Sequence, residues 1–394
     1  MIGALLPRSG SLSYLGPVQE AAVAAAQASI NAAGGVLGQP LAVVSADSGD
    51  VSTDVSGQSV PHLLSSQVTA VVGPSSSAVV NTVLAQLTGA GILVVTPAAT
   101  GVGLGAGGAG GLFARTTPTD ATVTRVLAAQ LRAQGARRVG VVALGEAWSA
   151  SVAPMLMADL RGSPTRVVAA ATYPVGSTTV APAVSTVLAA HPDAVVVVGA
   201  GQSAQVVAAL RGVGLPSASP GEAASARPGP VAPDPRLFLM DTAVSTALYA
   251  SLPTGTLAGA VGIAAGPGQS LALRTALAAA SSGLTAEISA PETYDAVVLV
   301  ALAAQQTAAV GGVALAAGLR AVTTGQVRCG SYADCLAALK AGHTIRYLGA
   351  SGPVAFTASG DRSVVSVGVY SFGPDNGFGN GPTAVLTGPA ATLR

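Results

Sequence analysis

Short apolar runs alternate with longer Ala-rich segments along most of the chain. The runs are rich in Val, Ile and Leu and are bounded by Gly or Pro, as at 2–6 (IGALL), 92–95 (ILVV) and 194–199 (AVVVVG). The segments between them have helical length, for example 17–32 and 120–134. Uninterrupted apolar runs of this length are typical of parallel strands that helices cover on both faces. The pattern therefore predicts an α/β fold of doubly wound parallel sheets.

The predicted strands form two series, one before about residue 116 and one after it, which predicts two lobes. The stretch 217–235 is rich in Pro, Ser, Ala and Gly and indicates an exposed loop in the second lobe. Residues 382–394 are expected to form a loosely held tail. The other predicted strands lie at 41–46, 70–73, 139–144, 166–172 and 237–240, with a strand-rich end at 345–348, 353–356 and 364–372.

The composition excludes some classes of protein. Half of the 394 residues are hydrophobic, only 3% are aromatic and 9% are charged, so the cores are built mainly from Ala, Val and Leu. A net charge of +1 without a basic cluster argues against nucleic acid as a partner, because phosphate binding needs several cations on one face. Pro, Gly or hydroxyl residues interrupt every apolar stretch within the roughly 20 residues that a spanning helix needs.

The two cysteines bear on the compartment. Cys329 and Cys335 lie in CGSYADC, without the spacing or the clustered His that a zinc site requires, so we predict a local disulfide and an oxidising compartment. The alternative is two unpaired, partly buried thiols. No signal peptide precedes the strand at 2–6, so the protein is expected either to be cytoplasmic or to have lost its leader.

Two Ser/Thr-rich turns lie in a stretch without charge from Val55 to Ala114. GPSSSA follows one predicted strand and leads into a helix, which puts Ser76 and Ser77 near an N-cap, where free amides favour an anion. TPAAT follows the next strand. Both turns should lie at the carboxyl ends of parallel strands, where ligands bind. Hydroxyls and amides suit a small carboxylate or amide, although plain helix capping alone would explain one serine.

The motifs for nucleotide binding and catalysis are weak. GLGAGG at 103–108 matches G-x-G-x-x-G but runs on into a predicted strand, so it indicates a loop. Neither a G-x-S-x-G nor an H-E-x-x-H motif occurs. His62, His191 and His343 lie in unrelated contexts that suit turns or the surface, and Asp47 and Asp50 lie in a polar loop. We therefore expect no enzyme, no cofactor and no metal.

Two single residues in the second series have two interpretations each. Trp148 lies just after the strand at 139–144, where it either packs in the core or covers the apolar part of a ligand. Asp241 directly follows the strand at 237–240, where it either caps the next helix or pairs with a ligand ammonium.

Several of these stretches together resemble one family. INAAGGVLGQPL and GILVVTPAAT carry the resemblance most specifically, with IGALLPRSGSLSYLG, AVVGPSSSAVV and FARTTPTD in the expected order. ETYDAVVLVALA and IRYLGASGPVAFTASGD resemble the closing segment. The chain is thus similar to the type I periplasmic solute-binding proteins of branched-chain amino-acid ABC transporters over nearly its whole length, least over 200–240.

This resemblance implies a Venus-flytrap fold, in which three crossovers join two doubly wound lobes around a ligand cleft. By analogy the crossovers lie near Thr117, Thr242 and Leu348. The expected N-terminal lobe therefore comprises 1–117 and 243–347, and the C-terminal lobe 118–242 and 348–394.

The resemblance also implies a ligand site. Ser77 and Thr100 would hold an α-carboxylate, Ala98 would offer its carbonyl to the ammonium, Trp148 would close over the ligand, and Asp241 would be at or beside the acidic ammonium partner. The family's second aromatic residue, expected near Gly201 or Gln202, is absent, and Leu15 beside Tyr14 replaces an aromatic of some members. The complete expected ligand-binding set is Tyr14, Ser76, Ser77, Ala98, Ala99, Thr100, Trp148, Gln202 and Asp241.

The function that the resemblance implies is that of an extracytoplasmic receptor for an ABC importer, free in the periplasm or anchored as a lipoprotein. Its expected partners are a small amino acid or carboxylate and a membrane permease, and it is expected to be a monomer. The alternative is a ligand sensor or receptor of the same fold that binds a small amide or an aromatic carboxylate.

Overall fold

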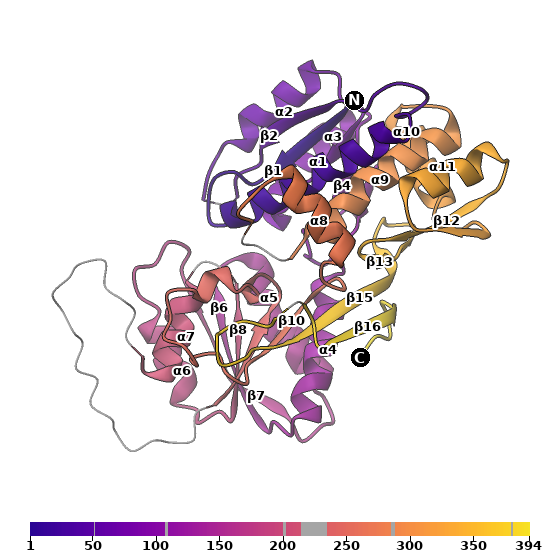
Figure 1. The fold of residues 1–394 in the computed structure, drawn as a ribbon. Helices are drawn as coiled ribbons and strands as arrows, with labels where there is room; N and C mark the ends of the chain where they lie inside the picture. The colour runs from indigo at the N-terminus through magenta and orange to yellow at the C-terminus, as the bar shows by residue number, and fades with distance from the viewer. Residues whose placement is uncertain (51, 107–108, 200–201, 214–234, 285–287, 380) are drawn as a thin grey trace. The chain divides into compact units, whose positions relative to one another are not determined.

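The chain folds into two compact units, each built from discontinuous segments. The computed structural model (Figure 1) describes residues 1–50, 52–106, 109–199, 202–213, 235–284, 288–379 and 381–394. Unit 1 comprises Met1–Thr119, Ala265–Ser366 and Thr387–Thr392, and unit 2 comprises Asp120–Ala264, Val367–Leu386 and Leu393–Arg394. The loop expected at 217–235 lies outside the described residues except for its last position.

The sheet of unit 1 has five parallel strands in the order β2-β1-β3-β4-β5. These strands are β1 (Ile2–Leu6), β2 (Val43–Asp47), β3 (Ala70–Val72), β4 (Leu93–Thr96) and β5 (Phe113–Arg115). The strand order reverses at β1, between β2 and β3. In doubly wound sheets, ligands bind outside the carboxyl ends of the strands beside such a reversal. The loops after β1, β3 and β4 are therefore the candidates for a site in this unit.

Helices cover both faces of this sheet. The helices of unit 1 are α1 (Gly16–Ala32), α2 (Ser56–Ser65), α3 (Ser77–Gly89), α8 (Leu271–Ala280), α9 (Ala290–Thr307), α10 (Gly312–Ala321) and α11 (Tyr332–Lys340), with a 3-10 turn η1 (Ser13–Leu15). Ile2, Ala4 and Leu6 of β1 belong to a buried cluster with α1 and α9, while Leu5 belongs to a second cluster with α2 and α3. Successive side chains of a strand point to opposite faces, so each face of β1 has its own core.

Within the described residues, no single helix is both long and apolar enough to cross a membrane. Helices α9 and α10 meet that test only as a pair, and the chain bends by 99° between them.

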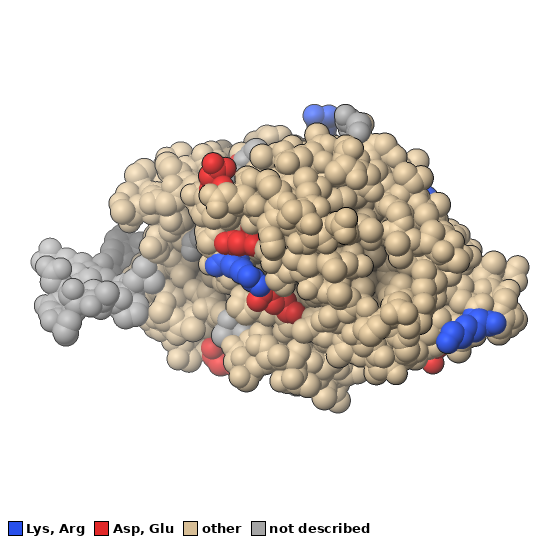
Figure 2. Space-filling view, turned by 90° about the horizontal axis from the view of Figure 1, so that it is seen from above, with Lys and Arg blue, Asp and Glu red and all other residues tan. Residues whose placement is uncertain are grey.

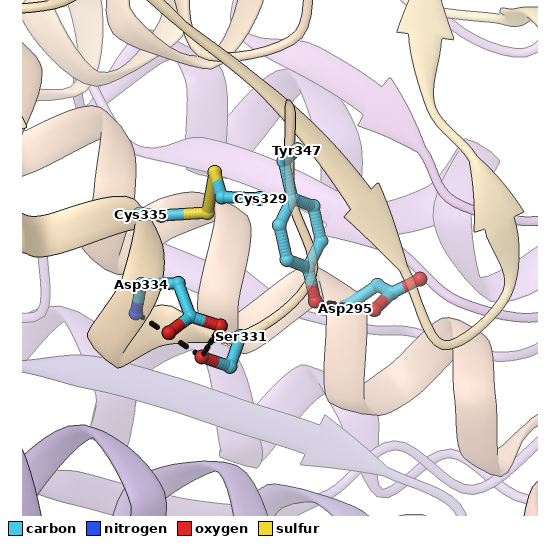
Figure 3. Close-up of a disulfide and its surroundings, with 6 residues drawn as sticks. All are labelled: Asp295, Cys329, Ser331, Asp334, Cys335 and Tyr347. Carbon is cyan, nitrogen blue, oxygen red and sulfur yellow. Dashed lines mark hydrogen bonds between the residues drawn. A yellow bond between two sulfur atoms is a disulfide. The ribbon is translucent and has the colours of Figure 1, made fainter. Parts of the chain in front are cut away.

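A small third sheet carries the disulfide. It consists of β11 (Val327–Cys329), β12 (Ile345–Gly349) and β13 (Gly352–Pro353). Cys329 at the end of β11 is bonded to Cys335 in α11, which confirms the predicted disulfide (Figure 3). Both cysteines are buried, at 6% and 0% exposure.

The second large sheet has the order β14-β15-β10-β9-β8-β6-β7, and β16 lies beside β15. Its strands are β6 (Arg138–Leu144), β7 (Arg166–Tyr173), β8 (Ala194–Val198), β9 (Arg236–Met240), β10 (Val261–Ala265), β14 (Ala355–Phe356), β15 (Arg362–Ser371) and β16 (Ala384–Pro389). The strands from β6 to β10 run parallel. The accompanying helices are α4 (Asp120–Ala133), α5 (Ala147–Asp159), α6 (Ala181–Leu188) and α7 (Ser203–Arg211), with 3-10 turns η2 (Asp241–Ala243) and η3 (Ala247–Tyr249).

The expectation of a loosely held tail at 382–394 was wrong. Strand β16 pairs with β15, and the hydroxyls of Ser366 and Thr387 lie 2.9 Å apart. The N–H of Ala390 also donates to the carbonyl of Ser363 at 2.8 Å. Strand β16, near the end of the chain, is thus held by β15, the strand that precedes it in the sequence.

The chain passes between the units after Thr119, Ala264 and Ser366, and again near its end after Leu386 and Thr392. The first position lies beside the expected Thr117, whereas the second and third lie further along than Thr242 and Leu348. Strand β10 stays in the sheet of unit 2 up to Ala264, and the hairpin formed by β12 and β13 stays in unit 1, so both passages come later.

Candidate functional site

The two polar turns of unit 1 lie at the carboxyl ends of neighbouring strands. Ser76 is the N-cap of α3, and its hydroxyl accepts a 3.4 Å hydrogen bond from the N–H of Val79. Capping therefore accounts for Ser76. The hydroxyl of Ser77 has a different partner, because it accepts a 3.0 Å hydrogen bond from the N–H of Gly101. Ser77 thus joins the turn after β3 to the turn after β4.

A second link fastens the same two turns. The hydroxyl of Thr96, at the end of β4, donates to the carbonyl of Pro74 at 2.5 Å and accepts from the N–H of Ala99 at 3.1 Å. Thr96 is fully buried. Because the turns share two hydrogen-bonded bridges, they form one rigid polar surface.

This surface has free donors. Across the part of the chain that the structure describes, the N–H groups of Ser77, Ala78 and Thr100 donate no hydrogen bond, and the hydroxyl of Thr100 makes none. Ser77 and Ala78 open α3, whose first amides carry the positive end of the helix dipole. Such a group of amides suits a small anion.

Arg115 is a buried residue beside these turns that the sequence analysis did not single out. Its side chain is fully buried, and Nη1 donates to the carbonyls of Ala99 and Gly101 at 3.0 and 2.9 Å. Its Nε pairs with Asp361 at 2.7 Å. The signal in the sequence was its position, since Arg115 is the charged residue that ends the uncharged stretch from Val55 to Ala114.

The loop after β1 carries Tyr14, which lies half-buried in η1. Two carboxylates from the β2 side fasten this loop: Asp47 accepts from the N–H of Arg8, and Asp50 accepts from the hydroxyl of Ser11 at 2.6 Å. Burial raises the pKa of Asp50, but hydrogen bonds from Ser11, Ser52 and Leu12 outweigh it and hold the pKa below its usual value. Asp47 and Asp50 therefore fasten the loop through hydrogen bonds that favour their ionised forms.

Asp241 directly follows β9 in unit 2. It is only 7% exposed, and its backbone has φ +49°, which is uncommon for a residue other than Gly. Met240 is the N-cap residue of η2, and the carboxylate of Asp241 accepts a hydrogen bond from the backbone of Thr242 in that turn. Burial and, next, the charge of Asp120 at the start of α4 raise its pKa to about 7. A buried carboxyl in a strained backbone at a strand end is typical of a functional residue.

The other two candidates of unit 2 differ. Gln202 is the N-cap residue of α7, and its Nε2 donates to the carbonyl of Ser177 at 3.1 Å. Trp148 lies in the first turn of α5, but its side chain falls outside the described part of the structure.

Another polar group of unit 2 was not predicted. Tyr173 ends β7, is 2% exposed, and its hydroxyl has no hydrogen-bond partner in the described part of the chain. Burial and the charge of Glu146 raise its pKa.

Unit 1 therefore brings Ser76, Ser77 and the segment 98–100 together, with Tyr14 on a loop at the same edge of the sheet. Trp148, Gln202 and Asp241 belong to unit 2, each just beyond the carboxyl end of a strand. Within the described ranges, no group of three or more His, Cys, Asp or Glu side chains could hold a metal ion. Figure 2 shows one face of the molecule, on which charged side chains are few; near its middle a Lys or Arg side chain lies between two acidic side chains.

Several solved protein structures have a fold similar to that of this chain. The chain resembles the branched-chain amino acid transporter substrate-binding protein LivJ from Streptococcus pneumoniae, solved with isoleucine, at 21% identity and a TM-score of 0.76, over 98% of this chain and 99% of that one. It also resembles the leucine-binding protein LivK from Thermotoga maritima, at 16% identity and a TM-score of 0.73, over 98% of this chain and 97% of that one. A third similar structure is a solute-binding protein of R. palustris, solved with benzoate. Its sequence identity is 16% and its TM-score 0.72, over 100% of this chain and 96% of that one.

A search of curated protein sequences finds no match. The family model described as periplasmic binding protein matches residues 1–361. With the two doubly wound parallel sheets and the structural neighbours, this match confirms the type I fold expected from the sequence. The chain belongs to the periplasmic binding protein family.

Proposed function

We propose that this protein is the solute receptor of an ABC importer and that it binds a small amino acid, branched-chain or related. The observation that carries the proposal is the pair of fused turns in unit 1, with undonated N–H groups at Ser77, Ala78 and Thr100 within the described residues. They would hold the α-carboxylate together with the hydroxyl of Thr100. Family membership and the neighbours solved with isoleucine and leucine support the same class of ligand.

The ammonium would be held by Asp241 of unit 2, with the carbonyl of Ala98 as a second acceptor. An ionised carboxylate buried to 7% exposure is costly unless a cation pairs with it, so the ligand would supply the missing charge. Trp148 would cover the side chain of the ligand. Gln202 would lie at the edge of the site, since its amide already donates to Ser177. Tyr14 would approach from the loop after β1.

Binding would work without chemistry on the ligand. A ligand that touches both units stabilises their closed arrangement, and only this differential affinity shifts the population. A micromolar affinity would correspond to about 8 kcal/mol at standard state. Several hydrogen bonds from preorganised amides and one ion pair out of water are sufficient for that value. The protein would accordingly be no enzyme, and turnover of an amino acid or amide by purified protein would contradict this part of the proposal.

The closed form would be presented to a membrane permease, and the receptor would act outside the cytoplasm as a monomer. Family membership supports the location, and so does the disulfide, since disulfides persist in oxidising compartments. Sedimentation of the purified protein with and without ligand tests the oligomeric state.

A second candidate is a receptor for an aromatic carboxylate or a small amide. The neighbours solved with benzoate and p-hydroxybenzoic acid favour it, because such ligands need the anion surface of unit 1 but no ammonium partner.

A thermal-shift screen decides between the two, after partial unfolding and refolding to remove any bound ligand. Stabilisation by leucine, isoleucine or valine, followed by calorimetric titration, is the expected result. Stabilisation by benzoates alone would favour the second candidate, and no stabilisation by any carboxylate would contradict both.

A further inference from the structure

Arg115 lies beneath the turn that follows β4, and its contacts determine which way that turn faces. The guanidinium is fully buried, and Nη1 donates to the carbonyl oxygens of Ala99 and Gly101 at 3.0 and 2.9 Å. Hydrogen bonds from a charged donor are shorter and stronger than those from a neutral one. Two carbonyls of the turn are therefore held toward the same buried group.

The direction of the Ala99 carbonyl determines the direction of the next N–H group, that of Thr100. In a trans peptide the C=O of one residue and the N–H of the next point in opposite directions. Since the carbonyl of Ala99 points to Arg115, the N–H of Thr100 points away from it. That N–H has no acceptor among the described residues, and Thr100 is 4% exposed. The hydrogen bond to the Ala99 carbonyl also polarises this peptide unit and makes its N–H a better donor.

Asp361 holds Arg115 in turn. Its carboxylate lies 2.7 Å from Nε of Arg115, and the N–H of Arg115 donates to the carbonyl of Gly360 at 3.0 Å. Asp361 belongs to a tight turn between β14 and β15, where its carbonyl accepts from the N–H of Thr357 and its carboxylate from the hydroxyl of Ser359. The side chain of Asp361 is 27% exposed, so it can be changed with little disturbance of the core.

From this chain of contacts we propose that Arg115, oriented by Asp361, is a positioning residue that sets the preference of the protein for a carboxylate over the matching uncharged amide. Neither residue touches the ligand. Arg115 acts through the direction and polarity of the 99–100 peptide, and Asp361 acts through Arg115. The inference rests on the proposed function, because it assigns the ligand's carboxylate to the turns of unit 1.

Arg362 is a matched control. It is a second buried guanidinium of unit 1, 3% exposed, and its Nη1 donates to the carbonyl of Thr116 at 2.7 Å and to the hydroxyl of Ser351 at 2.9 Å. Among the described residues, its side-chain hydrogen bonds go to residues 116, 351, 353 and 364 and not to the turn at 97–101. A change at Arg362 therefore perturbs a buried cation of the same unit without releasing the turn.

The test compares Asp361→Asn, Arg115→Lys and Arg362→Lys with the wild type in calorimetric titrations. The probes are leucine with leucinamide and benzoate with benzamide, and the pair that contains the better wild-type ligand is used. We expect Asp361→Asn and Arg115→Lys to weaken carboxylate binding by about twofold to tenfold while amide binding stays within error. Arg362→Lys should lower the melting temperature and leave the carboxylate-to-amide ratio unchanged.

The inference would be overturned if the affinities for carboxylate and amide fell by the same factor in both Asp361→Asn and Arg115→Lys. Arg115 would then be a structural residue only. A change in the ratio as large in Arg362→Lys as in these two variants would overturn it as well. A wild type that binds neither leucine nor benzoate would instead refute the proposed function, and the inference would fall with it.

Discussion

The N–H of Gly101 donates a 3.0 Å hydrogen bond to the hydroxyl of Ser77, although the two residues follow different strands. A Cβ at position 101 would lie only 3.0 Å from this hydroxyl oxygen, so a glycine allows the close approach. The bond ties the hydroxyl of Ser77 to the turn after β4, while the backbone N–H of Ser77 has no acceptor in the described structure. Ser77 therefore shapes the anion surface with its side chain and offers its amide to a ligand.

Substitution of Thr100 by Ala should weaken carboxylate binding about tenfold, because it removes one hydrogen bond to a charged group. Ser77→Ala should have a similar effect by a different route, since it releases the N–H of Gly101 and loosens the turn. Titration calorimetry with leucine measures both. Thr82→Ala is the control, as Thr82 is exposed on α3 and its hydroxyl donates, within the described residues, only to the carbonyl of Ala78. Wild-type affinity in both variants would refute the site.

Replacement of Asp241 by Asn should weaken the binding of amino acids more than the binding of ligands that lack an ammonium. Loss of an ion pair that is out of water is expected to cost leucine about tenfold or more in affinity. Binding of 4-methylpentanoate, which has the same carbon skeleton without the ammonium, should change little. If the affinities for both ligands fall by the same factor, Asp241 does not contact the ammonium.

The stability of the protein should depend on pH through Asp241. Its pKa is about 7 in the folded state against an ordinary value of 3.8, first because of burial and second because of Asp120. Between these values the folded state holds a proton that the unfolded state has lost, so stability falls as the pH rises toward 7 and levels off above it. The loss should be of the order of a few kcal/mol.

Thermal unfolding of the wild type and of Asp241→Asn at pH 5, 6, 7 and 8 tests this sign. The asparagine at position 241 cannot ionise, so the stability of the variant relative to the wild type should increase from pH 5 to 7 and then stay constant. Affinity for leucine should rise over the same range, because the carboxylate must be ionised to pair with an ammonium. Parallel stability curves for the two proteins would contradict the assignment.

The disulfide should add stability without affecting the ligand. Cys329 and Cys335 are six positions apart, and closing so short a loop is worth about 2 kcal/mol. Intact mass should rise by two hydrogens on reduction, and the double variant Cys329→Ala, Cys335→Ala should unfold at lower urea. Leucine affinity should be that of the wild type, and a clear loss of affinity would show that this region takes part in binding.

Tyr347→Phe should destabilise unit 1 by about 1.5–3 kcal/mol, the usual range for a hydrogen bond to a charged group. The hydroxyl of Tyr347 donates to Asp295 at 2.7 Å in a fully buried site (Figure 3). Burial raises the pKa of Asp295, although Ser351, Tyr347 and Ala350 donate to its carboxylate and oppose the shift. Urea unfolding measures the loss, and an unchanged midpoint would mean that the carboxylate finds another donor.

The sequence by itself determined the fold class and where the polar turns begin. Continuous apolar runs alternating with helical segments have few solutions other than parallel sheets covered by helices, and the turn after each strand must lie at the carboxyl edge. This reasoning placed Ser76, Ser77 and Thr100 at the ends of β3 and β4, where the structure has them. These features depend on local periodicity, which the sequence displays directly.

Only the tertiary structure decided which distant residues complete each site. Asp361 lies 246 positions after Arg115 in the chain, Asp241 lies 121 positions after Asp120, and β16 depends on its pairing with β15. No periodicity connects such residues, because their proximity results from how strands and helices pack. Arg115 looks like an ordinary charge at the end of a strand, and it becomes a positioning residue only because folding buries it beneath two carbonyls of the turn after β4.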